Sequence, residues 1–189
     1  MGEIPLADKI REIHRVLTEA GLPHAFGGAL ALAYYGEPRT TVDIDVNVFV
    51  EPARFEDVVR ALAPFGVERV PDAASVSRDG QGRLWWGRTP VDLFFAYDPV
   101  HEAMRSALRV VPFGESTIPV LAPEHLLVAK VVFDRAKDRL DVEQVLVACP
   151  DLDLSEVHRW LDHLLGPGDR RLEWFAGLES RVLGRPRPA

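Results

Sequence analysis

The residues with the clearest chemical potential are two aspartates one position apart, Asp43 and Asp45. Apolar and polar side chains alternate over residues 42–48, which is typical of a β-strand whose alternate residues share a face. The pattern predicts that the two carboxylates stand side by side, with Cα atoms roughly 6 to 7 Å apart. Adjacent negative charges repel and lose hydration unless a cation joins them. We therefore predict a metal site suited to two Mg²⁺ ions; an ordinary acidic, solvent-facing strand is the alternative.

A glycine pair, Gly27 and Gly28, precedes the first aspartate by a spacer of fourteen residues. The pair is expected to turn the chain between a short buried strand over 24–26 and an apolar helix over 29–35. Two glycines usually mean a plain turn. Ahead of an Asp-x-Asp strand they also indicate a place where backbone N–H groups approach a triphosphate. The segment lacks the Gly-Lys-Ser/Thr ending of a Walker A loop and is not a G-x-G-x-x-G fingerprint.

The string GGALALAYYGEPRTTVDID, residues 27–45, resembles the nucleotidyltransferase superfamily related to DNA polymerase β. In particular it resembles the bacterial AbiEii-type branch, which includes toxins of toxin–antitoxin pairs; the spacer is slightly longer than the commonest one. The resemblance implies an α/β (α+β) fold, with a small mixed β-sheet flanked by helices and a helical C-terminal region. It also implies Mg²⁺-dependent transfer of a nucleotide from a nucleoside triphosphate to an acceptor hydroxyl, with RNA or tRNA as acceptor and an antitoxin as partner.

Asp92 is the candidate third carboxylate, since it is an isolated acid in the apolar strand expected over 89–97. The residues alone are equally consistent with a single exposed aspartate on a sheet edge. In the superfamily that this sequence resembles, a third acid on a neighbouring strand completes the metal site and helps to deprotonate the attacking hydroxyl.

Lys130 lies in an apolar helix, with Asp138 and Asp141 following eight and eleven residues later. One interpretation is structural, with a snorkelling lysine, Asp138 as a helix N-cap and Asp141 at the N3 position. The segment also resembles the downstream Lys-(seven residues)-Asp-x-x-Asp segment of AbiEii-type proteins. That resemblance implies that Lys130 faces the nucleotide phosphates, that it and Asp138 are catalytic, and that Asp141 contributes to nucleotide binding.

Two residues ahead of the aspartates fit the same family string. Arg39 either clamps a phosphate or covers surface, and Thr41 either is a good strand residue or lines the nucleotide pocket. In the toxins that this sequence resembles, a Ser or Thr at this place is also a target of antitoxin-directed phosphorylation. A phosphate there would carry about −1.5 to −2 charge beside two carboxylates and oppose binding of Mg²⁺ and nucleotide.

Further strands are expected over 66–70, 74–78, 83–88 and 89–97, with a hairpin at Asp79-Gly80. The doublet Trp85-Trp86 is either a base-stacking platform or, more commonly, one packed and one half-exposed ring. Residues 98–108 are expected to form a helix and 109–121 a second hairpin. The last third reads as helices, and residues 185–189 as a frayed tail.

Length and composition bound the remaining choices. The chain has 189 residues, 47% of them hydrophobic, which predicts one medium-sized domain with ample material for a core. Strand patterns give way to helical ones near residue 120, which predicts an α/β core over 1–120 with a helical region over 121–189 packed on it. Its net charge of −7 gives no overall basic field for a polynucleotide, so a local basic patch would be required. A lone cysteine, and the lack of a signal-peptide or membrane-spanning pattern, predict a cytoplasmic protein. The alternatives are an antibiotic (aminoglycoside-like) nucleotidyltransferase and a non-catalytic binding module of the same fold.

Overall fold

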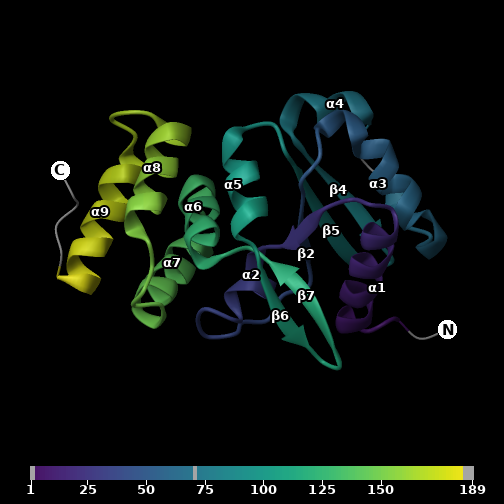
Figure 1. Cartoon of the computed structure of the whole chain (residues 1–189), viewed down its shortest axis with the longest axis horizontal. Helices are drawn as coiled ribbons and strands as arrows, with labels where there is room; N and C mark the ends of the chain where they lie inside the picture. Colours follow the sequence, from purple (N-terminus) through teal and green to yellow (C-terminus); the bar gives the residue numbers. More distant parts are fainter. Residues whose placement is uncertain (1–2, 70–71, 185–189) are drawn as a thin grey trace. The chain divides into compact units, whose positions relative to one another are not determined.

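The computed structural model describes residues 3–69 and 72–184 and has the α/β fold class predicted from the sequence (Figure 1). The chain divides into two compact units. The first lies within residues 1–30 and 40–121, and the second within residues 31–39 and 122–189. Helix α2 (Gly28–Leu32) begins in the first unit and ends in the second.

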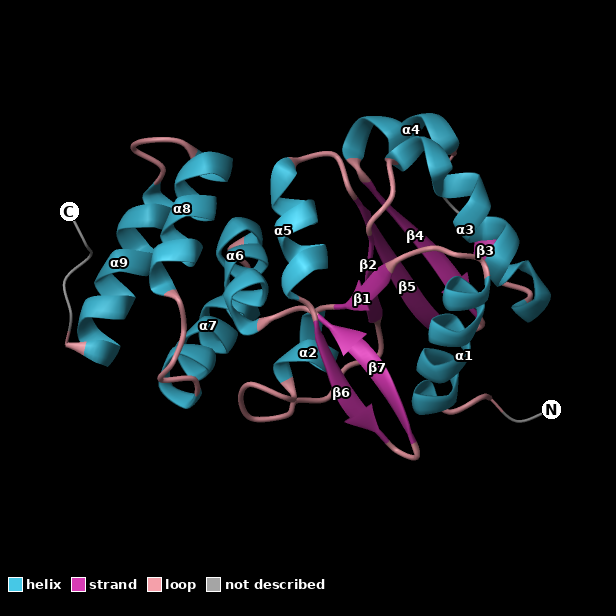
Figure 2. Cartoon of the chain, viewed as in Figure 1, coloured by secondary structure: helices cyan, strands magenta, loops and turns pink. Residues whose placement is uncertain are grey.

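The first unit is built on a mixed sheet, drawn in magenta in Figure 2. Within the described part of the chain the sheet has seven strands: β1 (His24–Phe26), β2 (Ile44–Val48), β3 (Glu68–Arg69), β4 (Gln81–Trp86), β5 (Thr89–Phe95), β6 (Arg109–Phe113) and β7 (Ser116–Val120). Their order is β3-β4-β5-β2-β1-β7-β6. The β2–β5 and β1–β7 pairs are parallel and the other pairs antiparallel. Parallel pairing joins strands from distant parts of the sequence, so β2 and β5 become neighbours.

The helices of this unit supply the apolar side chains that pack on the sheet. They are α1 (Leu6–Glu19), α3 (Phe55–Leu62), α4 (Ala73–Asp79) and α5 (Pro99–Ala107), with the 3₁₀ turns η1 (Pro52–Arg54) and η2 (Ala63–Phe65). Phe55 of α3 meets Phe95 of β5 edge to face, with ring centroids 6.0 Å apart. Both rings are fully buried, so each contributes about 1.5–3 kcal/mol of hydrophobic stabilisation.

Strand β5 illustrates how the sheet separates a core face from a polar face. Val91, Leu93 and Phe95 are fully buried, whereas Asp92 and Phe94 between them are half-buried. This is the period-two pattern of a strand with one face in the core. The polar face of the same strands carries the aspartates discussed below.

The second unit is helical in its described residues, apart from residues 33–39, the links between its helices, and the ends of those helices. Its helices are α6 (Pro123–Phe133), α7 (Ala136–Ala148), α8 (Leu154–Leu165) and α9 (Arg170–Leu183). Leu127, Val142, Leu161 and Phe175 are buried in its core. None of the helices in the described ranges is long and apolar enough to cross a membrane.

Three local expectations were wrong in detail. Residues 74–78 belong to helix α4, because Asp72 caps its N-terminus by accepting the Ser75 N–H at 2.7 Å and Gly80 ends it with a left-handed φ of 65°. There is accordingly no hairpin at Asp79-Gly80; the turn between β4 and β5 follows Trp86. The strand of the two aspartates begins at Ile44, which leaves Val42 outside it and 69% exposed.

Other expectations hold with shorter bounds. The apolar helix after the glycine pair ends at Leu32 rather than residue 35. The strand expected over 66–70 is β3, and its last expected residue lies outside the described residues, as does the tail 185–189.

Candidate active site

Two of the predicted aspartates, Asp45 and Asp92, lie in one row across the sheet of the first unit. Asp45 of β2 is the Cα partner of Asp92 on β5, and Asp92 is the Cα partner of Arg83 on β4. Paired residues on neighbouring strands project from the same face. On the other side of β2, the Gly27 N–H donates to the Asp45 carbonyl oxygen at 2.9 Å. The row therefore runs from Gly27 through Asp45 and Asp92 to Arg83.

Gly28 makes room for the Asp45 carboxylate. A Cβ atom on Gly28 would lie 1.7 Å from Asp45 Oδ2 and 2.5 Å from its Cγ, so the carboxylate could not keep its present position. Gly28 also has a left-handed φ of 54°, which favours glycine. Gly28 is thus needed for the close approach of the carboxylate. Because the Gly27 N–H is committed to the sheet, the predicted phosphate contact rests on Gly28.

Asp43 lies immediately before β2, and its carboxylate accepts a hydrogen bond from the Thr41 hydroxyl. Thr41 and Asp43 are half-buried. A phosphate on Thr41 would remove this hydrogen-bond donor and place negative charge beside the Asp43 carboxylate. This is how phosphorylation of Thr41 would oppose binding of Mg²⁺ and nucleotide.

Arg83 is the residue of this site that sequence reasoning missed. Its Nε and Nη2 donate to the two oxygens of Asp92 at 2.6 and 2.7 Å. The hydrogen bond to Asp92 raises the pKa of Arg83, and the charges of Asp43 and Asp45 raise it further. Arg83 is therefore a counter-ion for all three carboxylates. Arg83 and Trp85 are two residues apart on a predicted strand, which indicates that they share a face. The register that places Arg83 opposite Asp92 depends on the pairing of β4 with β5, which the local sequence does not reveal.

The donor set suits a hard cation even without a third ligand. Among the residues that the structure describes, no group of three His, Cys, Asp or Glu side chains is placed to hold a metal ion. Mg²⁺ is commonly bound by one or two carboxylates, with water and substrate phosphates completing its shell. Asp43 and Asp45 supply such oxygens, and the room at Gly28 lets the Asp45 carboxylate lie against the glycine turn. Asp92 is the predicted third ligand, and in this structure its two oxygens accept from Arg83.

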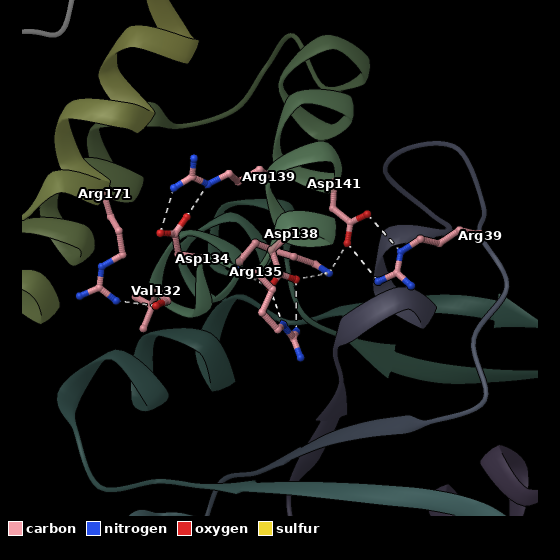
Figure 3. A network of polar contacts seen from close by, with 9 residues as sticks. Arg39, Val132, Asp134, Arg135, Asp138, Arg139, Asp141 and Arg171 are labelled. Carbon is pink, nitrogen blue, oxygen red and sulfur yellow. Dashed lines mark hydrogen bonds and ion pairs between the residues drawn. The ribbon is translucent and has the colours of Figure 1, made fainter.

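A second cluster lies in the second unit and contains the other predicted residues (Figure 3). The Lys130 ammonium lies 2.5 Å from Asp141 Oδ2 and 3.3 Å from Asp138 Oδ1. Arg39 donates from Nε and Nη2 to the two oxygens of Asp141, both at 3.1 Å. All but Arg39 are buried, which rules out a snorkelling lysine. The structure thus brings Arg39, Lys130, Asp138 and Asp141 together in one ion-pair network.

The charges within this cluster compensate one another. Burial alone would raise the pKa of Asp141, but hydrogen bonds and charge from Arg39 and Lys130 outweigh it and lower the pKa. Asp138 accepts from Arg135 Nε at 2.6 Å and from the Arg135 backbone N–H at 3.2 Å. Asp138 is therefore at the N3 position of α7 and not at the N-cap, which is Arg135.

The fold of the chain is similar to that of solved nucleotidyltransferases and proteins like them. The antibiotic-resistance factor ANT(2″)-Ia has a TM-score of 0.62 at 16% identity, with 95% of this chain and 97% of that chain covered. The lincosamide antibiotic adenylyltransferase LnuA gives 0.55 at 12%, covering 76% and 98%. A nucleotidyltransferase-like protein from Paracoccidioides brasiliensis gives 0.54 at 14%, covering 95% and 97%. At such identities the likeness shows the fold.

The family is given by the sequence itself. Residues 15–160 match the model of the family described as "Nucleotidyl transferase AbiEii toxin, Type IV TA system". The chain belongs to this AbiEii family of nucleotidyltransferases. A comparison with curated protein sequences gives no significant match.

Proposed function

We propose that this protein transfers a nucleoside monophosphate from a nucleoside triphosphate to a hydroxyl at the end of an RNA, with tRNA as the first candidate. The hydroxyl oxygen forms a bond to the α-phosphorus, the bond from that phosphorus to the bridging oxygen breaks, and pyrophosphate leaves. The hydroxyl proton passes to Asp92. The observation that carries this proposal is the row of carboxylates on β2 and β5 beside the Gly28 turn.

The residues of the first unit have separate roles in this proposal. Asp43 and Asp45 would hold Mg²⁺, which when bound supplies positive charge to the triphosphate and to the developing charge of the transition state. The backbone of Gly28 would contact the phosphates. Because Gly28 has no side chain, the Asp45 carboxylate can lie against it. Asp92 lies between Asp45 and Arg83, and Arg83 fixes the orientation of its carboxylate.

Within the cluster of the second unit, Arg39 is proposed as a phosphate-binding residue. The Lys130 ammonium is occupied by two carboxylates, so we assign it and Asp138 to positioning Asp141. Asp141 in turn holds one edge of the Arg39 guanidinium, whose side chain is 30% exposed. Arg39 retains its outer Nη1 for a phosphate, since only Nε and Nη2 face Asp141.

We also propose a biological setting. The AbiEii description as a toxin of a Type IV system supports a role as the toxin of a toxin–antitoxin pair. We propose that it acts in the cytoplasm. Growth arrest on expression, relieved by the cognate antitoxin, is the expected phenotype.

A second candidate acceptor is an antibiotic. The net charge of −7 suits a small cationic acceptor. Two proteins of similar fold are the antibiotic-resistance factor ANT(2″)-Ia and the lincosamide antibiotic adenylyltransferase LnuA. Drug resistance on expression, without growth arrest, would select this candidate. A protein that binds neither nucleotide nor metal would be the non-catalytic module.

The direct experiment incubates the protein with Mg²⁺, each α-³²P-labelled NTP in turn, and total tRNA. We expect label on RNA from the wild type and from Asp79→Asn, a matched change of an exposed aspartate. Asp43→Asn should lose about a hundredfold or more of the transfer rate while keeping its circular dichroism spectrum and melting temperature. A folded Asp43→Asn variant with wild-type activity would overturn the proposed mechanism.

A further inference from the structure

The tryptophan doublet of β4 divides between the two faces of the sheet. Trp86 is buried, and its ring stacks on Phe65 with centroids 4.4 Å apart and planes 16° from parallel. Trp85, one residue earlier, must project from the opposite face and is half-buried. That face is the one that carries Arg83, whose guanidinium carbon lies 6.0 Å from the centre of the Trp85 ring.

Trp85 lies level with the start of the aspartate strand. It is the Cα partner of Pro90 on β5. This pair lies two residues along the strands from the pair formed by Arg83 and Asp92, on the same face of the sheet. Continuing the β2–β5 register by one residue places Asp43 beside Pro90. Since neighbouring strands are about 4.8 Å apart, β4 lies roughly 10 Å from β2 along this row.

The geometry of the transfer fixes which side the acceptor uses, and this step rests on the proposed function. Attack on the α-phosphorus is in line with the departing pyrophosphate. The row begins at the glycine turn beside β1, where the triphosphate is proposed to bind, and ends at β4. The attacking hydroxyl therefore comes from the side of β5 and β4, which is where Arg83 and Trp85 lie.

We propose that Trp85 stacks the base of the nucleotide that carries the attacking hydroxyl, and that Arg83 contacts its phosphate. Stacking on an aromatic ring is available to every base and does not depend on sequence. Asp92 engages only Nε and Nη2 of Arg83, so the Nη1 edge can meet a phosphate. The acceptor class selected by this face is thus a single-stranded nucleic-acid end.

Binding of a fluorescein-labelled single-stranded oligoribonucleotide with a free 3′ hydroxyl tests this without turnover. Its anisotropy would be measured with Mg²⁺ and no NTP. Trp85→Ala should raise the Kd about tenfold or more, and Trp85→Phe should restore most of the affinity. Trp174→Ala is the matched control, because Trp174 of α9 also packs against an arginine, Arg139, at 4.9 Å. It should leave the Kd unchanged.

The arginine is tested by salt dependence. Arg83→Gln should reduce the slope of log K against log salt by about one, and Arg139→Gln should not. Calorimetric NTP binding should be the same in wild type and Trp85→Ala.

Three results with the Trp85 variants would overturn the inference. The first is an unchanged Kd for the oligoribonucleotide in Trp85→Ala, and the second is a Kd in Trp85→Phe as high as in Trp85→Ala. The third is weaker NTP binding in Trp85→Ala, which would mean that the ring stacks on the base of the NTP. A wild type that binds no oligoribonucleotide but labels another acceptor would also overturn it while leaving nucleotidyl transfer intact.

Discussion

Replacing Gly28 with alanine tests the geometry at the centre of the site. The new Cβ would lie 1.7 Å from Asp45 Oδ2, 2.5 Å from Cγ and 3.0 Å from Cβ. Rotation of the carboxylate can relieve the first two contacts but not the third, so the turn or the strand must also move. Relief of such overpacking typically costs about 1–3 kcal/mol. The left-handed backbone adds about 1–2 kcal/mol for a residue with a Cβ.

Gly21 provides a control that separates these two terms. It has a similar φ of 63°, and a Cβ there would meet nothing within 4 Å. Gly21→Ala should therefore carry only the backbone cost of about 1–2 kcal/mol, while Gly28→Ala should be less stable by a further 1–3 kcal/mol or so. Changes in unfolded-state entropy are equal in the two variants and cancel.

Urea unfolding measures the stability difference, and single-turnover transfer measures the effect on the site. A displacement of Asp45 by about 1 Å should reduce the transfer rate roughly a hundredfold. Gly21→Ala should retain wild-type transfer. Equal stability of the two alanine variants, together with full activity of Gly28→Ala, would refute the reasoning that Asp45 lies against Gly28.

Two other changes test the buried ionisable groups. Lys130→Met removes one partner from each of two buried carboxylates, Asp138 and Asp141. Urea unfolding should show a free energy of unfolding lower by about 3 kcal/mol. Lys137→Met, at an exposed position, should leave it unchanged. Burial lowers the pKa of His24 from 6.5 to about 4, so stability is full above pH 6.5 and falls by about 3 kcal/mol as the pH approaches 4. His24→Gln should flatten this part of the pH–stability curve and His163→Gln, at an exposed position, should not; an unaltered curve in His24→Gln would contradict the assignment.

The elements that could be predicted from the sequence are those with strong local signals. The alternation around Asp43 and Asp45 gave the strand, and the glycine pair gave the turn in front of it. The error at residues 74–78 arose because Ser-Val-Ser alternates like a strand. The capping aspartate at 72 and the glycine at 80 were the competing local signals, and they decided the outcome.

The partners of the predicted residues could not be read in the same way. Arg83 faces Asp92 because of an antiparallel register, and Asp92 faces Asp45 because of a parallel one. Such registers depend on packing across the whole sheet. Likewise, Arg39 meets Asp141 across more than a hundred residues of sequence. The sequence therefore identified the charged residues but not the ion pairs in which they are held.

The charge distribution of the aspartate row is itself an argument for a site. A cross-strand pair of opposite charges such as Arg83 and Asp92 contributes only about 0.2–1 kcal/mol to a sheet, and like charges placed opposite each other oppose folding. Asp45 and Asp92 are such a like-charged pair, in register on adjacent strands, with Asp43 close by. Stability alone would not assemble three carboxylates around one guanidinium. The arrangement is understandable where a cation and a polyphosphate supply the remaining interactions during function, at the expense of stability in their absence.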